Sequence, residues 1–128
     1  MEILVLIGRI LFSAIFIASG VQHITRGGMM SPNAAAKGVT APDLMVRLSG
    51  AMVFLGGISV LLGAYARIGA GLLTLFLIPT AFVMHNYWTL SDPAAKANDQ
   101  AQFFKDIALA GAAMLIWYFG SGPFSLVS

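Results

Sequence analysis

The chain has 128 residues, of which 59% are hydrophobic and only 9% are charged. Soluble domains carry roughly 25% charged residues, so this composition excludes an ordinary soluble domain. The apolar content and the net charge of +2 exclude disorder, and the absence of cysteine excludes disulfides, thiolate metal sites and cysteine nucleophiles.

Four apolar segments follow one another in the sequence, and a bilayer span needs about 20 such residues. We therefore predict membrane-spanning helices at residues 3–22, 44–64, 68–88 and 103–120. Arg9 lies in the first segment, where it is either a buried partner or a charge that reaches the interface. Pro79 lies inside the third segment and predicts a kink, because proline lacks an N–H and clashes with the preceding turn.

The connections between these segments differ in length. Residues 22–43 are turn-rich and form a long connection, which indicates a functional or re-entrant segment. The turn at residues 64–67 is very short, so the second and third helices form an antiparallel hairpin. Residues 89–102 are predicted to be a second polar loop that begins at a turn over Asp92 and Pro93.

The expected fold is an all-α membrane protein with one domain over residues 1–128. Its four helices form an antiparallel bundle with both termini on the same side. Small residues favour close helix packing in lipid, among them Gly56, Gly57, Gly63 and Gly111. Five Lys and Arg residues flank the two long connections and two flank the other side, which favours a cytoplasmic location for the long connections.

Polar residues gather at one end of the predicted bundle, and nine of the twelve charged side chains lie on that side. Polar residues close to a membrane core are costly and are functional candidates. Simple anchoring at the interface is the alternative, since helix ends normally carry such residues. The candidates come from the ends of the first, third and fourth predicted helices and are His23, His85, Asn86, Trp88, Gln102, Lys105 and Asp106.

Several classes of function lose support. Two histidines without a recognised ligand spacing do not indicate a metal or haem site, so we expect no metal. The chain has no phosphate-binding loop, dinucleotide fingerprint or nucleophile elbow. No basic run is present, so we expect no nucleic-acid partner. No carboxylate lies in the middle of a span, which counts against proton-coupled transport.

The sequence resembles the DoxX family of small bacterial membrane proteins over almost its whole length. The motifs that carry the resemblance are Arg9–Leu11, Ala18–His23, Leu55–Arg67, Ala81–Trp88, Gln102–Gly111 and Gly120–Leu126. His85, Asn86, Trp88, Gln102, Lys105, Arg67 and Gly111 match family positions, and His23 and Asp106 match in part. The sequence departs from the family pattern at Val53, where many members carry Glu, at Asp106, where they carry Asn, and at Val127, where they carry Asp.

The resemblance implies a multi-pass protein of the bacterial inner membrane and a membrane subunit of a redox or detoxification system. The leading hypothesis is that it binds a quinone or similar small aromatic at one leaflet. His85, Asn86 and Lys105 would then hydrogen-bond the ligand oxygens, and Tyr87 and Trp88 would pack on its ring.

Two other functions stay open. The chain is alternatively a non-enzymatic assembly or anchoring protein for a partner oxidoreductase, or, with less support, a small-solute carrier. The residue pattern does not decide whether the chain is itself an enzyme. The expected partners are the lipid bilayer, a membrane or soluble oxidoreductase subunit, and a second copy of the chain.

Overall fold

The computed structural model describes residues 2–126, and it is built from helices, as the sequence predicts. The elements in chain order are α1 (Glu2–Thr25), α2 (Gly27–Ala36), α3 (Pro42–Leu62), α4 (Ala66–Met84), the short 3₁₀ helix η1 (Tyr87–Thr89) and α5 (Pro93–Phe119). No β-strand occurs within this described part of the chain.

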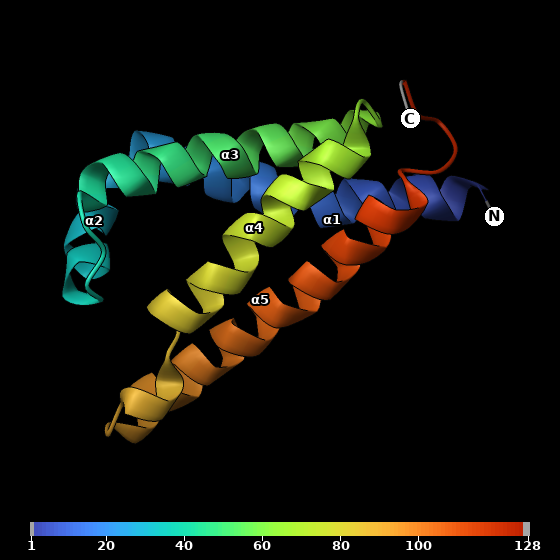
Figure 1. Ribbon diagram of the computed structural model, residues 1–128. Coiled ribbons are helices and arrows are strands. Elements are labelled where there is room, and N and C mark those ends of the chain that lie inside the picture. Colours follow the sequence, from blue (N-terminus) through green and yellow to red (C-terminus); the bar gives the residue numbers. More distant parts are fainter. Residues whose placement is uncertain (1, 127–128) are drawn as a thin grey trace.

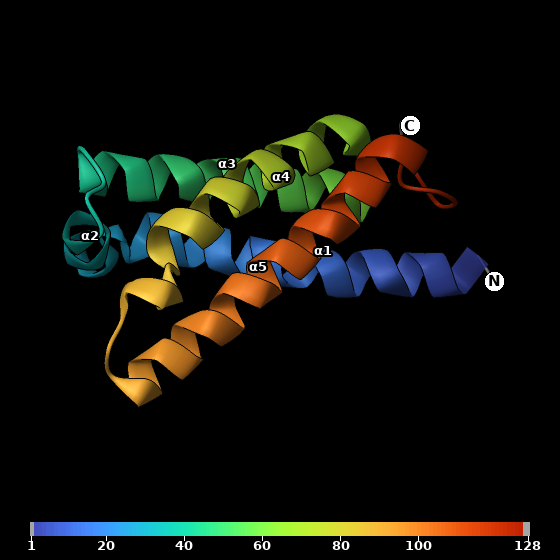
Figure 2. The ribbon, with the colours of Figure 1, turned by 60° about the horizontal axis from the view of Figure 1, so that its bottom comes forward.

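The four long helices pack in the order α1, α3, α4, α5, with the most extensive contacts between α1 and α3 and between α4 and α5. Figure 1 shows α1 and α3 side by side in opposite directions, and α4 and α5 as a second pair that diverges from them. The start of α1 and the end of α5 lie at one end of the molecule, and α2 lies at the other (Figures 1 and 2).

Three segments are long and apolar enough to cross a membrane: Glu2–Thr25, Pro42–Leu62 and Ala66–Thr89. They correspond to the first three predicted spans. The fourth predicted span, residues 103–120, forms the later part of α5, where Lys105 and Asp106 reduce its apolar character. The chain is therefore an all-helical protein with three clear candidate spans and further helices.

Two predicted loops are partly wrong, because each contains a helix. Residues 22–43 include α2, and residues 93–102 form the first turns of α5. The pair Asp92–Pro93 starts this helix: the Asp92 carboxylate accepts a hydrogen bond from the backbone N–H of Ala95 at 3.0 Å, and Pro93 occupies the first turn. An Asp N-cap followed by proline is a strong helix start.

The end of α4 also differs from the prediction. The helix runs through Pro79 and ends at Met84, so residues 85–88 do not continue it. His85 and Asn86 are irregular, and Tyr87–Thr89 form η1. This break turns the backbone at the point where the polar candidates begin.

Glycines bring the helices close together. A Cβ atom on Gly56 would lie 2.9 Å from the Leu73 side chain and 3.0 Å from the carbonyl oxygen of Gly69. A Cβ atom on Gly57 would lie 3.1 Å from Phe16. These two neighbours on α3 therefore permit contacts with α4 and α1 respectively, and the predicted role in close packing fits both positions.

Arg9 is buried and holds the C-terminal segment against α1 and α3. Its side chain is only 5% exposed, and its guanidinium makes five hydrogen bonds. The acceptors are the carbonyl oxygens of Leu61, Ser121, Pro123 and Phe124, at 2.6–3.1 Å, and the hydroxyl of Ser125, at 3.3 Å. The structure thus decides between the two alternatives for Arg9 in favour of a buried partner.

Gly63 completes this end of the molecule. It ends α3 in the left-handed conformation, with φ 66°, which favours glycine. A Cβ atom there would lie 2.6 Å from the Cα of Ser125. Both its conformation and this contact explain why a glycine occupies the position.

Candidate functional site

The polar residues at the end of α4 form a connected network with α5 and the end of α2. The Nδ1 atom of His85 lies 3.4 Å from Asp99 Oδ1, and its Nε2 atom lies 3.7 Å from Asp106 Oδ2. The Lys37 ammonium donates a hydrogen bond to Asn86 Oδ1 at 2.8 Å and lies 3.5 Å from Asp99 Oδ2. One imidazole therefore lies between two carboxylates, and Lys37 joins the end of α2 to Asn86 and to one of these carboxylates, that of Asp99.

Asp106 is the most buried charged member of this network, at 5% exposure. Its Oδ1 atom lies 4.0 Å from the Lys105 ammonium, which also donates a hydrogen bond to Gln102. A buried carboxylate is tolerated only when neighbouring groups compensate its charge. The Lys105 ammonium supplies a compensating positive charge, and the His85 ring faces the carboxylate from the end of α4.

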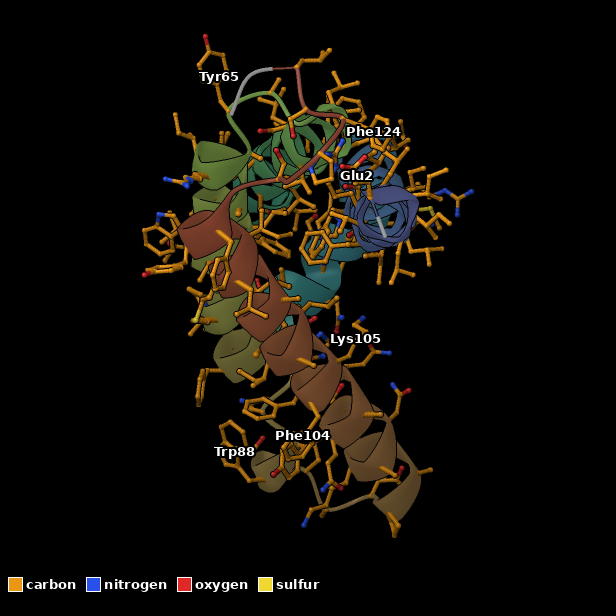
Figure 3. All side chains as sticks on the ribbon, turned by 90° about the vertical axis from the view of Figure 1, so that its right-hand side faces the viewer. Glu2, Tyr65, Trp88, Phe104, Lys105 and Phe124 are labelled. Atoms are coloured by element: carbon orange, nitrogen blue, oxygen red, sulfur yellow. The ribbon has the colours of Figure 1, made fainter. Side chains whose placement is uncertain are left out.

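Trp88 belongs to an aromatic cluster rather than to the polar network. Its ring centroid lies 5.3–6.1 Å from those of Phe82, Tyr87 and Phe103, and the side chain is half exposed. Figure 3 shows Trp88 and Phe104 together on one side of α5, with Lys105 on the other. Of the predicted ligand contacts, Lys105 and Trp88 therefore lie on different sides of this helix.

A cavity of about 480 Å³ lies between α1, α2, α3 and α4, where the two helix pairs diverge. Its wall is mainly apolar and includes five of the seven methionines in the chain, namely Met29, Met30, Met45, Met52 and Met84. Methionine is flexible and polarisable, and it fits irregular apolar partners. This volume and lining are typical of a site for a small apolar molecule.

Four polar side chains interrupt this apolar wall: His23, Asn33, Ser49 and Thr80. His23 lies here, apart from the His85 network, with its Nδ1 atom 2.7 Å from the carbonyl oxygen of Ser19. Its ring meets Phe76 edge-on at a centroid distance of 6.1 Å. Val83 and Met84 form the wall next to His85, so the polar network begins where the cavity wall ends.

Five of the seven predicted ligand residues lie in one connected network: His85, Asn86, Gln102, Lys105 and Asp106. Lys37 and Asp99 belong to the same network but were not among the predicted residues. Asp99 precedes Asp106 by seven residues, which is two helical turns and one helix face. That signal was hidden because residues 89–102 were read as a loop.

Within residues 2–126, no group of three or more His, Asp or Glu side chains is placed to hold a metal ion. The Arg47 guanidinium lies outside the His85 network: it is 3.3 Å from the Asp43 carboxylate and donates to the carbonyl oxygen of Ile24. The arrangement can therefore hold a small apolar molecule and can position polar groups beside it.

Comparison with known proteins gives the family. The sequence model of the DoxX family matches residues 4–86, which is more than half of the chain. The chain belongs to the DoxX family. The inner membrane protein YphA of Escherichia coli is 30% identical over 124 residues, which cover 97% of this chain and 88% of the relative. No solved structure matches the chain at a significant level.

The DoxX match confirms the predicted family, and the relative and the apolar helices confirm the predicted inner-membrane location. The match covers every residue that lines the cavity, from His23 to Met84. It ends at Asn86, before the network partners Asp99 and Asp106 on α5. The cavity therefore lies wholly within the part of this DoxX protein that carries the family pattern.

The predicted structural residues of this DoxX protein have different surroundings. Pro79 lines the cavity, and Arg67 lies near Gly120 at the other end of α4. A Cβ atom on Gly111 would meet no heavy atom within 4 Å among the described residues, so close packing does not require a glycine there.

The departures from the family pattern can be located in part. Val53, where many members carry Glu, is fully buried in the apolar core with Phe16 and Leu73. Val127 lies outside the described residues. At this position of α3, a packed aliphatic side chain therefore contributes to the apolar core.

Proposed function

We propose that this DoxX-family protein binds a quinone or a similar small aromatic molecule in the methionine-rich cavity and acts as the membrane subunit of a redox or detoxification system. The observation that carries the proposal is the cavity of about 480 Å³ beside the His85 network. Its apolar wall suits an aromatic ring, and its few polar groups suit ring oxygens.

The proposal includes the membrane arrangement. Four helices would cross the bilayer, with the apolar part of α5 as the fourth span and both termini on the same side. The cavity and the polar network would then lie at one leaflet, at the end that carries α2. The excess of Lys and Arg around the long connections favours the cytoplasmic leaflet.

The polar network would hold the rim of this cavity. Lys37 joins α2 to Asn86, and His85 joins the end of α4 to Asp99 on α5. These contacts keep the ends of three elements together beside the cavity wall. Direct contacts of His85, Asn86 and Lys105 with ligand oxygens stay a prediction, and these side chains would exchange a protein partner for the ligand.

Binding of duroquinone to the purified protein in lipid nanodiscs tests the proposal. Thr80→Trp places an indole in the cavity and is expected to weaken binding at least about tenfold. Leu72→Trp is the matched control, because Leu72 lies on the same helix but does not line the cavity; it lines a second hollow near Arg67 and Trp117. It should bind as the wild type does.

Equal binding by both tryptophan variants, or no binding by the wild type, would overturn this assignment. The pair His85→Ala and Lys105→Ala, combined in one protein, tests direct contact with ligand oxygens. Affinity equal to the wild type would assign these two residues to the rim alone.

The alternative role in assembly has one observation in its favour. The first turns of α5, residues 93–102, are polar and mostly exposed, and they extend the helix beyond its apolar part. Such a segment could contact a soluble partner. Crosslinking in native membranes that yields a stoichiometric partner, together with an absence of quinone binding, would favour this role.

A further inference from the structure

We infer that the cavity selects ligands that donate hydrogen bonds, so that it prefers a quinol or another phenol to the corresponding quinone. This inference rests on the proposed function, because it concerns the chemistry of the same cavity. It follows from two polar side chains in the wall, His23 and Ser49. Each donates its hydrogen to a backbone carbonyl oxygen, so each has only a hydrogen-bond acceptor left.

His23 presents an acceptor. Its Nδ1 atom lies 2.7 Å from the carbonyl oxygen of Ser19, and a carbonyl oxygen can only accept. Nδ1 therefore carries the hydrogen, and in the neutral imidazole the other nitrogen, Nε2, has a free lone pair. Among residues 2–126, the hydrogen bonds of this imidazole are made by Nδ1, so Nε2 has no protein partner there, and His23 is one of the residues that line the cavity.

Ser49 presents a second acceptor. Its hydroxyl donates to the carbonyl oxygen of Val46 at 2.9 Å, which uses its one hydrogen and leaves lone pairs on the oxygen. Asn33 and Thr80 can each donate or accept, so they can serve a quinone or a quinol, and the difference between the two ligands rests on His23 and Ser49.

The cavity wall also lacks charge. None of the described residues that line it is Lys, Arg, Asp or Glu. A phenolate or a carboxylate would enter without a counter-charge, which is costly in an apolar site. The neutral hydroxyl form of the ligand fits best.

A quinol hydroxyl can donate a hydrogen bond to either acceptor. A quinone oxygen carries no hydrogen, so it cannot form a hydrogen bond with either of them. A polar group of the wall that loses water on binding and gains no partner lowers the affinity for that ligand. We expect a preference of about tenfold for the quinol.

Affinities for duroquinol and duroquinone, measured without oxygen on the protein in nanodiscs, test the inference. The full set of ring methyl groups prevents side reactions with nucleophiles. A redox-inert pair, 2,6-dimethylphenol and its methyl ether, isolates the hydroxyl hydrogen. The quinol and the phenol should each bind about tenfold more tightly than their partners.

His23→Phe keeps a planar ring and removes the acceptor, so it should lower quinol affinity about tenfold and leave quinone affinity unchanged. Ser49→Ala serves as a second variant. It removes the other acceptor without filling the cavity, so it should reduce the ratio of quinol affinity to quinone affinity. The phenol and ether pair gives an answer on the wild type alone, even if a variant does not fold.

The outcomes separate this inference from the proposed function. If both members of each pair bind equally and Thr80→Trp still blocks binding, the preference for hydrogen-bond donors is overturned. The proposal that the cavity binds a ligand is then retained. Tighter binding of the quinone and the ether overturns the donor preference too. Absence of binding by all four compounds overturns both this inference and the proposed function.

Discussion

Replacement of Arg9 by methionine is expected to lower the free energy of unfolding by about 3–5 kcal/mol. The guanidinium is the shared donor for four carbonyl oxygens and one hydroxyl, which join α1, the end of α3 and the C-terminal segment. Methionine keeps an unbranched apolar stem but leaves these acceptors without their donor. Unfolding in mixed detergent micelles, followed by circular dichroism, measures the loss.

Arg26→Met is the matched control for this change. Arg26 is exposed at the end of α1, and its side chain makes no hydrogen bond with the described residues, so the same substitution should change stability by about 0.5 kcal/mol or less. Arg9→Lys should fall between the two, because an ammonium has three donors and lacks the planar geometry of a guanidinium. Equal stability of Arg9→Met and Arg26→Met would contradict the role assigned to Arg9.

Replacement of Gly50 by alanine is expected to cost about 2–3 kcal/mol and to weaken ligand binding. The added Cβ atom would lie 2.5 Å from the Cβ of His23, 3.1 Å from the carbonyl oxygen of Gly20 and 3.2 Å from the backbone nitrogen of Ile24. Two of these atoms belong to the backbone of α1, so the helix itself must move. That movement also displaces His23 from the cavity wall.

Gly111→Ala provides the control on another helix. Its Cβ atom would meet no described heavy atom within 4 Å, and alanine favours a helix over glycine by about 0.5–1 kcal/mol. This variant should be as stable as the wild type or slightly more stable. Parallel unfolding measurements compare the two, and a similar loss in both would show that glycine packing does not distinguish these positions.

Much of the fold could be predicted from the sequence, because runs of apolar residues of membrane-spanning length are a strong signal. The three clear spans were found within a few residues. The helix at residues 93–102 was missed because its composition is polar and its start at Asp92 and Pro93 is also typical of a turn. The helix α2 was missed because its glycines and Pro32 are typical of loops.

The candidate site could be predicted only in part. His85, Lys105 and Asp106 could be grouped because consecutive antiparallel helices place their polar ends on the same side of the bundle. The cavity could not be predicted, since its methionines come from three helices and each one looks like an ordinary apolar residue. Their convergence depends on how far the two helix pairs diverge, which no local pattern encodes.

Photolabelling with an azidoquinone tests the central claim most directly, because it reports where the ligand binds in a native membrane. We predict that the label attaches within residues 23–84, in peptides that line the cavity, that excess quinone competes it away, and that Thr80→Trp abolishes it. Label that excess quinone does not displace, or label confined to the lipid-facing surface of α1 or to α5, would contradict the claim that the methionine-rich cavity is the ligand site.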